Sequence, residues 1–538
     1  MHILFRLLSS IAVTLVLYGS YLLFNIIQFR INSQIKDVPG PPSKHWFWGN
    51  MKEIMDSDAA VLHEKWAKEY GHTLKYKMLF GRERLLTMDT KALNHVLMNH
   101  YIYQKPEAAR YNLSQILGEG ILVTEEDKHK LQRKIMNPAF GPSQIRELTE
   151  IFVDKSIELR DVWTARVAAG GGKARIDVLS SLSKMTLDVI GLAGFNYKFN
   201  ALKDDGGSNE LNKAFAVIFG DPEAQKIRPW PLAQTLIPPL RGLPSQDPPG
   251  FKEAKKTMSR IGQNLLRDTQ AALRDTAGRK SENWNSRDLL SLLVRSNMSG
   301  EQGQMSDDDV LAQVPTFLVA GHETTRSTTW ALFALVQHPD VQHKLREELL
   351  YTLSTENPSM DELNSLPYLD KVVRETLRVH APVPGTMRVA AQDDVIPLGK
   401  PFIDKKGVAR DSVSVQKGQT IFVPILAINR DKSLWGEDSM KFKPERWDNL
   451  PAAVSSIPGV WGNLLTFLGG ARACIGYRFS LVEMKALLFI LVRNFEFELA
   501  VPADDVIAKS TVVQRPRLKS EKDAGSQLPL IVRLHQKA

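Results

Sequence analysis

Cysteine is almost absent from this chain, which has one, Cys474, among 538 residues. A single thiol excludes an intramolecular disulfide framework and is typical of a reducing compartment. It also excludes zinc and iron–sulfur sites built from several thiolates. Internal repeats, phosphate-binding loops and flavin- or nicotinamide-binding signatures are missing too. The sequence therefore shows no nucleotide cofactor of its own.

An excess of one charge sign is also missing. The chain has 69 Lys and Arg against 60 Asp and Glu, a formal net charge of +9. This mild basic excess suits an anionic membrane surface or an acidic partner, and it is too diffuse to indicate nucleic acid. With 43% hydrophobic and 24% charged residues, the composition is that of a globular protein with a large core.

Charged residues are absent from residues 7–27, LLSSIAVTLVLYGSYLLFNII. This run is long enough to cross a bilayer as a helix. A cleaved signal peptide would have a shorter apolar region and a small-residue cleavage site, whereas this run carries Tyr18, Tyr21 and Phe24. We therefore expect an N-terminal tip at 1–6 and a retained transmembrane anchor at 7–27. More basic residues follow the span than precede it, so the remainder is expected in the cytosol.

Two proline-rich stretches interrupt regular structure. Val38–Pro42 contains three prolines and a glycine, so we expect residues 28–44 to form a stiff hinge. Residues 229–249 contain seven prolines among apolar side chains, which excludes one regular helix and favours contact with an apolar surface. No interdomain linker follows, so residues 45–538 are expected to form a single domain.

The strongest local pattern surrounds the cysteine and reads Phe467-Leu-Gly-Gly-Ala-Arg472-Ala-Cys474-Ile-Gly476. A helical pattern begins soon afterwards, at Ser480. On a glycine-rich turn before a helix, backbone N–H groups and the helix dipole favour a negatively charged sulfur. A lone cysteine is more often an inert, buried thiol, but the fixed spacing here favours a functional thiolate.

A second pattern lies in a long helix predicted from Ser306 to residue 338. Aspartates after Ser306 provide capping chemistry, and Pro315 should bend the helix. Its middle is apolar and then abruptly polar at Glu323 and Thr324. Buried polar groups cost free energy unless something uses or satisfies them. Either a threonine bonds a carbonyl one turn earlier, or the turn is functional.

Three further signals are weak when taken alone. Residues 125–140 form a polar helix, whose charged side chains could simply lie in solvent. Glu375 and Arg378 are three apart on one helix face, a spacing that contributes only about 0–1 kcal/mol at a surface. Arg446 follows in the run Phe-Lys-Pro-Glu-Arg-Trp.

The order of these motifs, from about residue 38 to the end, resembles the cytochrome P450 family. The resembling motifs are the proline-rich hinge, Ala320–Thr324, Glu375–Arg378, Pro444–Trp447 and the cysteine loop. The resemblance implies a mainly α fold with a smaller β-rich lobe (α+β), triangular in outline and preceded by one transmembrane helix. It also implies one haem b between the long helix and the cysteine loop.

The resemblance assigns roles to particular residues. Cys474 matches the axial iron ligand, while Glu323 and Thr324 match the motif that handles dioxygen and relays protons. His129 stands where many members carry a tryptophan, and an imidazole can also bond a carboxylate. A buried structural network is implied for Glu375, Arg378 and Arg446. The implied cofactor-binding residues are Arg133, His129, Arg388, Arg472, Phe467 and Gly476.

The implied activity is monooxygenation: one oxygen atom of O2 enters a lipophilic small molecule, for example by hydroxylation of a terpenoid-like secondary metabolite. Electrons would come from a membrane-bound NADPH–cytochrome reductase, or through cytochrome b5. The chain looks like fungal microsomal members: a monomer, single-pass in the endoplasmic reticulum membrane, with a cytosolic catalytic domain. A thiolate-haem isomerase or dehydratase and a non-catalytic haem sensor are the alternatives. Pocket walls are expected from an irregular stretch 105–120 and from 215–245, 312–320, 383–387 and 510–514.

Overall fold

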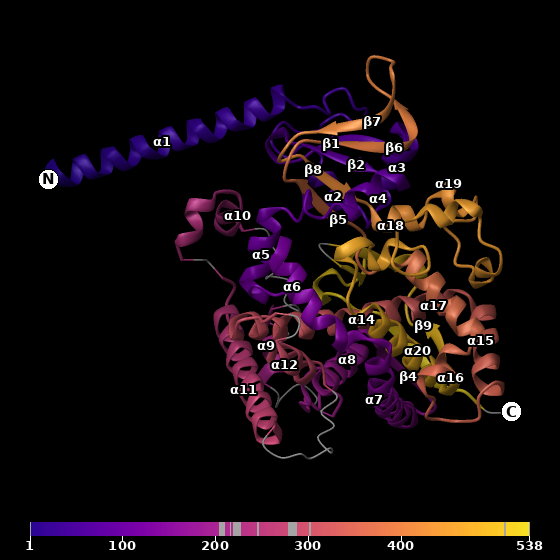
Figure 1. Cartoon of the computed structure of the whole chain (residues 1–538). Helices are drawn as coiled ribbons and strands as arrows, with labels where there is room; N and C mark the ends of the chain where they lie inside the picture. The colour runs from indigo at the N-terminus through magenta and orange to yellow at the C-terminus, as the bar shows by residue number, and fades with distance from the viewer. Residues whose placement is uncertain are drawn as a thin grey trace.

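The computed structural model describes residues 2–203, 210–215, 217–218, 228–244, 247–277, 288–300, 303–510 and 513–536. A large helical body lies against a smaller strand-rich lobe, and a long N-terminal helix projects away from that lobe (Figure 1). The predicted division into a mainly α body and a smaller β-rich part is therefore confirmed.

The strand-rich lobe is a five-stranded sheet of order β1-β2-β8-β5-β3, with a separate β6–β7 hairpin. The sequence predicts one helix at 52–70 and two strands around a turn at Gly81. The strands are present and pair antiparallel, whereas the helical stretch is divided into two helices. The elements of this lobe are α2 Met51–Asp56, α3 Val61–Tyr70, β1 Thr73–Lys77, β2 Glu83–Thr87, α4 Thr90–Met98, β3 Tyr103–Gln104, β5 Thr386–Ala390, β6 Asp394–Ile403, β7 Ala409–Val415 and β8 Thr420–Val423.

The helical body is built around α14, which packs against α8 and α20. Gly321 lets α14 approach α8 closely, because a Cβ there would lie 2.7 Å from Cγ1 of Ile190. The helices are α5 Glu107–Leu117, α6 Glu126–Met136, α7 Pro142–Ala169, α8 Val178–Phe195, α9 Glu210–Phe215, α10 Pro229–Leu236, α11 Phe251–Ala277, α12 Leu289–Ser299, α13 Asp307–Leu311, α14 Gln313–Gln337, α15 Pro339–Tyr351, α16 Met360–Asn364, α17 Pro367–Val379, α18 Ile425–Asn429, α19 Lys432–Trp435 and α20 Tyr477–Asn494.

Two small sheets complete the body. β12 (Pro529–Leu534) pairs antiparallel with both β4 (Lys173–Asp177) and β9 (Phe495–Leu499). β10 (Val506–Ser510) pairs with β11 (Gln514–Leu518). The sequence of the tail predicts strands at 511–513 and 529–533. The second is present as β12, while residues 511 and 512 of the first lie outside the described residues.

The long helix predicted from Ser306 to residue 338 is interrupted. Its cap is as predicted, because the Ser306 side chain accepts a hydrogen bond from the Asp309 N–H. The helix breaks at Ala312, between α13 and α14. Pro315 accounts for the break, since it lacks the N–H that would otherwise bond the carbonyl of Leu311.

The stretch 105–120 was expected to be irregular, and that expectation is wrong. Helix α5 occupies most of it. Pro106 precedes the first turn, and Gly118 ends the helix with φ of 68°, which matches the usual preference for proline before and glycine after a helix. The prediction that residues 229–249 do not form one regular helix is confirmed, because α10 is followed by a short 3-10 helix at Pro238–Gly242.

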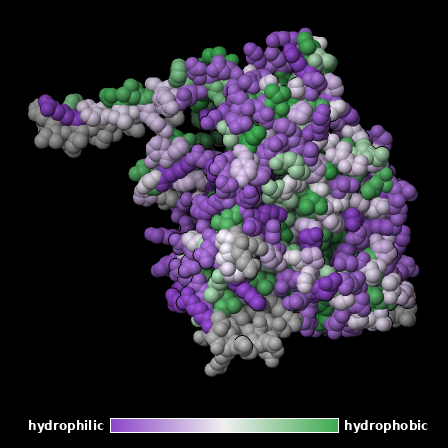
Figure 2. Space-filling model, viewed as in Figure 1, coloured by the Kyte–Doolittle hydropathy of each residue, from purple (hydrophilic) through white to green (hydrophobic). Residues whose placement is uncertain are grey.

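The N-terminal helix α1 spans His2–Ile31. Among the described helices, only α8 is long and apolar enough to cross a membrane, and 78% of it is buried, as in a core helix. In α1 the qualifying apolar stretch, Val16–Ile31, is shorter. Apolar side chains nevertheless stand on α1 beyond the surface of the body (Figure 2). The anchor at 7–27 therefore stays a prediction.

The predicted hinge at 28–44 is bound along the strand-rich lobe. Ile35 and Val38 are buried in the lobe's own apolar core. The backbone N–H of Lys75 donates to Pro39 O at 2.8 Å, and the Lys75 ammonium donates to the carbonyl of Lys36. The prolines therefore stiffen a segment that is already docked, so the direction of α1 is set by the lobe.

Candidate active site

The cysteine loop is held tightly before α20. The Cys474 N–H donates to the carbonyl of Phe467 at 2.8 Å, and the Gly476 N–H donates to the Cys474 sulfur. Gly470 has φ of 69°, and a Cβ there would lie 2.4 Å from Leu97 O. Only glycine fits both the left-handed conformation and this close approach. The motif's glycine is thus a requirement of the backbone at this turn.

Protein atoms lie close around the Cys474 sulfur, but the residue still borders open space. Burial raises the pKa of the Cys474 thiol, while the Gly476 N–H and the charge of Arg133 oppose that rise. The side chain nevertheless has accessible surface, so it lines a hollow. Ala320 in the middle of α14 is likewise exposed, although Leu318 beside it is buried. A group held between α14 and the cysteine loop fits these two surfaces.

Cations gather beside this hollow. Arg472 forms a buried ion pair with Glu125, whose other oxygen accepts the Lys105 backbone N–H. Burial, then the charges of Arg388 and Arg472, lower the pKa of Lys105 to about 7. Burial lowers the pKa of Arg388 to about 10. The charge of Arg110 also lowers the pKa of Lys105. The Nε atom of Arg110 is buried and has no hydrogen-bond acceptor among the described residues.

Four cations therefore surround one carboxylate. Uncompensated charge of this kind is costly when buried, and guanidinium and ammonium groups bind carboxylates through strong, charge-assisted bonds. The set fits a group that carries two carboxylates, such as the haem propionates. Arg388 and Arg472 were predicted from the sequence, whereas Lys105, Arg110 and Glu125 were missed. No fixed motif marks these three, and their only signal was a place in or near the stretch expected to form a pocket wall.

Helix α6 places His129 and Arg133 next to the same region. His129 is 3% exposed. Burial, and then the charges of Arg472 and Lys105, lower its pKa to about 2, so the imidazole is neutral near pH 7. Arg133 donates to the carbonyl of Ala473, directly before the cysteine. These two side chains face the protein interior, so the solvated-face alternative is wrong for them.

The polar turn of α14 is only partly described. Glu323 and Thr324 belong to the helix, but their side chains lie outside the described residues. The hydroxyl of buried Thr325 lies 2.5 Å from that of Thr186 on α8. The hydroxyl of Thr316 donates to a carbonyl one turn earlier. The alternative of threonine back-bonding is therefore realised elsewhere in this helix.

The network expected from Glu375, Arg378 and Arg446 forms as predicted. The Glu375 carboxylate lies 2.7 Å from Nη2 of Arg378 and 3.4 Å from Nε of Arg446. Arg378 also donates to the carbonyls of Asn429 and Ser439. All three side chains are buried. The two arginines donate to backbone carbonyls of segments that precede the cysteine loop. The network therefore fixes that part of the fold, and its role is structural.

Most of the chain matches known proteins. A model of the family described as Cytochrome P450 matches residues 39–520. Cytochrome P450 monooxygenase 205 of Postia placenta is 58% identical over 507 residues, which cover 93% of each chain. Cytochrome P450 monooxygenase 128 of the same fungus is 52% identical over 97% of each chain. Cytochrome P450 monooxygenase claQ of Ampulloclitocybe clavipes is 36% identical over 92% of each.

Proposed function

This chain belongs to the cytochrome P450 family of monooxygenases, and we propose that it uses haem b to insert one oxygen atom of O2 into a lipophilic small molecule. The observation that carries the proposal is the cysteine loop. Cys474 stands on a turn that only glycine allows, receives the Gly476 N–H, and keeps accessible surface although protein atoms surround it. These are the features of a thiolate held for an iron.

We assign a separate contact with the cofactor to each residue around the hollow. When bound, haem supplies the iron that activates O2 for insertion into a C–H bond. The Cys474 thiolate is the proposed axial ligand, and the Gly476 N–H tunes its charge. Neutral His129 donates one hydrogen bond to a propionate. The propionates are bound mainly by cationic side chains, for which we propose Lys105, Arg110, Arg133, Arg388 and Arg472.

We assign the handling of protons to α14. Thr324 holds dioxygen and a water in place, and Glu323 passes protons towards them. Phe467 packs behind the cysteine against Trp461 and Tyr477, where it keeps the loop rigid. We place the substrate on the α14 side, next to the exposed Ala320. We propose a terpenoid-like secondary metabolite as substrate, hydroxylated in the reaction.

We also propose an electron donor and a location for this chain. With no flavin or nicotinamide signature, the chain takes electrons from an NADPH–cytochrome reductase, or from cytochrome b5, on the cysteine side of the haem. Residues 7–27 anchor a monomer in the endoplasmic reticulum membrane, with residues 45–538 in the cytosol. Trp46 and Phe80, which follow α1 in the sequence, are exposed, and α10 carries the exposed Leu236. These apolar side chains suit contact with the lipid surface.

A carbon monoxide difference spectrum of the reduced protein tests the central assignment. We expect the red-shifted band of a thiolate-ligated haem, and its loss in Cys474→Ser. A wild-type spectrum without that band would overturn the proposal. Consumption of NADPH and O2 with a reductase then separates a monooxygenase from an isomerase, which needs neither. Substrate-induced spectral shifts across a terpenoid and lipid panel would identify the substrate class.

A further inference from the structure

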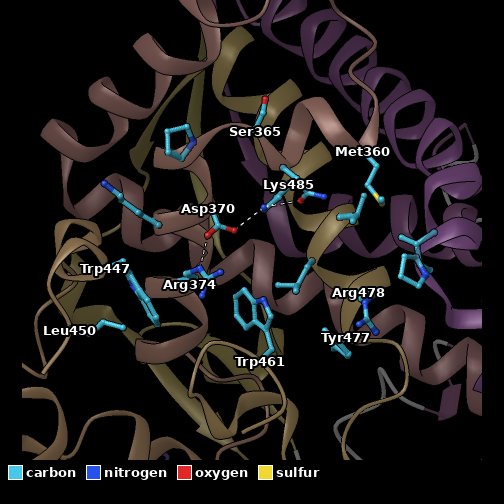
Figure 3. A pocket seen from close by; sticks show the side chains of 17 residues that line it. Met360, Ser365, Asp370, Arg374, Trp447, Leu450, Trp461, Tyr477, Arg478 and Lys485 are labelled. Carbon is cyan, nitrogen blue, oxygen red and sulfur yellow. Dashed lines mark hydrogen bonds and ion pairs between the residues drawn. The ribbon is translucent and has the colours of Figure 1, made fainter. Parts of the chain in front are cut away.

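A second hollow lies beside the cysteine loop, and its described lining includes no residue of α14. It has a volume of about 770 Å³, which is within the usual range for small-molecule sites. Its walls come from the start of α7, from α16, α17 and α20, and from residues 447–461. Figure 3 shows its aromatic side chains below a central group of charges. The aromatic lining consists of Trp447, Trp461 and Tyr477, and its aliphatic lining includes Ile145, Met360, Leu450, Leu481 and Val482.

The charges in this pocket are unbalanced. Asp370 is the only carboxylate among the described lining residues, and it already accepts from two cations, Lys485 at 2.8 Å and Arg374 at 2.5 Å (Figure 3). Lys371 and Arg478 also line the pocket. Lys371 pairs with an aspartate outside the lining. Arg478 stacks on a tyrosine ring and has no carboxylate partner within the described part of the chain. Apart from the paired Lys371, the pocket therefore carries three cations against one saturated anion.

Hydrogen-bond donors remain available on these cations. The Lys485 side chain is only 5% exposed. It uses two of its three N–H donors, on Asp370 and on the Asn364 amide oxygen. Arg374 donates to Asp370 from Nε, so its terminal N–H groups are not used on that carboxylate. Its guanidinium lies 4.8 Å from the centre of the Trp461 ring, so it is held in place before any ligand arrives.

The pocket also contacts the cysteine loop. The rings of Trp461 and Tyr477 have their centres 5.9 Å and 6.0 Å from that of Phe467. The carbonyl of Phe467 accepts the Cys474 N–H. A molecule in the pocket would therefore press on side chains that pack directly against the loop carrying the thiolate.

We propose that this pocket binds an amphipathic carboxylate, a small acid with an aromatic or aliphatic body. Its anionic head is held by Lys485, Arg374 and Arg478, and its body lies against Trp461 and Tyr477. An excess of donors with one saturated carboxylate excludes a cationic ligand, and the apolar lining disfavours a bare inorganic anion. Where the proposed cofactor and electron donor are correct, the ligand regulates electron delivery, because it occupies the cysteine side of the haem.

The experiment uses the full-length, haem-loaded protein with an iron-binding azole, 4-phenylimidazole, present at saturation to block the substrate pocket. The probe is the fluorescent anion 8-anilinonaphthalene-1-sulfonate, and its uncharged analogue N-phenyl-1-naphthylamine is the control. Binding is measured without reductase, so failure of the electron-donor proposal leaves this test untouched. We expect the anion to bind and the neutral analogue to bind more weakly.

Two variants locate the bound probe. Arg478→Ala should weaken probe binding about tenfold, the effect of losing one charge-assisted contact. Arg175→Ala removes the same charge from β4, outside the pocket, and should leave binding within about twofold. Ser365→Tyr fills the exposed rim of the pocket and should also weaken binding. Equal binding of the two probes, or affinity unchanged in both pocket variants, would overturn the proposal. Arg478→Ala that slows reduction by reductase without changing probe affinity would instead identify a protein-docking surface.

Discussion

Arg472 and Glu125 form an ion pair in which each side chain is only 5% exposed. One member lies on the cysteine loop and the other directly before α6, so the pair joins two segments that lie 347 residues apart in the chain. Breaking a buried pair by removing one partner leaves an uncompensated charge, which typically costs about 3–5 kcal/mol. This pair is therefore both a structural tie and part of the charge balance around the proposed propionates.

Glu125→Gln should destabilise the haem-free protein more than the haem-loaded protein. Without the carboxylate, Arg472 keeps its charge in a buried place, and only a propionate can then compensate it. Thermal unfolding of both forms measures the difference. Glu126→Gln, at the next position but with an exposed side chain, is the matched control and should change neither form by more than about 0.5 kcal/mol. An equal loss in both forms would contradict the assignment of Arg472 to a propionate.

Haem affinity should fall as the pH rises above about 7. In the haem-free protein the pKa of Lys105 is about 7, below the ordinary lysine value, because of burial and neighbouring cations. A propionate favours the charged ammonium, so binding above pH 7 requires the uptake of a proton, at a loss of at most about tenfold in affinity per pH unit. Haem titrations at pH 6.5 and 8.5 measure this effect.

Lys105→Met should flatten that pH dependence, while Lys134→Met, which removes an exposed ammonium from α6, should not. The same depressed pKa has a consequence for the haem-free fold. Between pH 7 and the ordinary lysine pKa the unfolded chain binds more protons, so the contribution of Lys105 to the free energy of unfolding rises with pH across that window. A pH-independent haem affinity in the wild type would remove Lys105 from the site.

Glu375→Gln should disrupt the fold around the cysteine loop. It would leave Arg378 and Arg446 buried with less negative charge to pair with, at a cost of about 3–5 kcal/mol. We expect a lower unfolding temperature together with incomplete haem retention. The exposed pair of Lys344 and Glu445 provides the contrast, and Lys344→Ala should cost at most about 1 kcal/mol. Full stability of Glu375→Gln would contradict a structural role for the network.

Motifs that express a strict backbone or charge requirement could be predicted from the sequence. Gly470 is an example, because its conformation and its distance from a carbonyl both exclude other residues. The contacts of Glu375 and Arg378 are another, since a buried acid and base at this spacing compensate each other. These requirements appear as fixed residues at fixed spacings, and short motifs are sufficient to identify them.

Features that depend on tertiary context were missed. Lys105 and Arg110 have no fixed spacing from the cysteine loop, and only the fold brings them beside Arg388. Helix α5 was not predicted because its limits are set by Pro106 and Gly118 and not by a strong apolar periodicity. The docking of residues 33–42 was missed for a similar reason: isolated apolar residues among prolines do not reveal the sheet that buries them.

Thr324→Ala should separate consumption of NADPH from formation of product. If Thr324 and Glu323 direct protons to dioxygen, loss of the hydroxyl leaves reduction intact but misdirects the protons, so that NADPH is still consumed while less product and more hydrogen peroxide form. Product, peroxide and NADPH are measured together with a reductase and a substrate identified by spectral shift. Thr329→Ala is the matched control, because its hydroxyl donates to a backbone carbonyl within α14, and it should preserve the ratio of product to NADPH. A thiolate-haem isomerase would turn over without NADPH in wild type and in both variants, and that result would replace the monooxygenase mechanism for this chain.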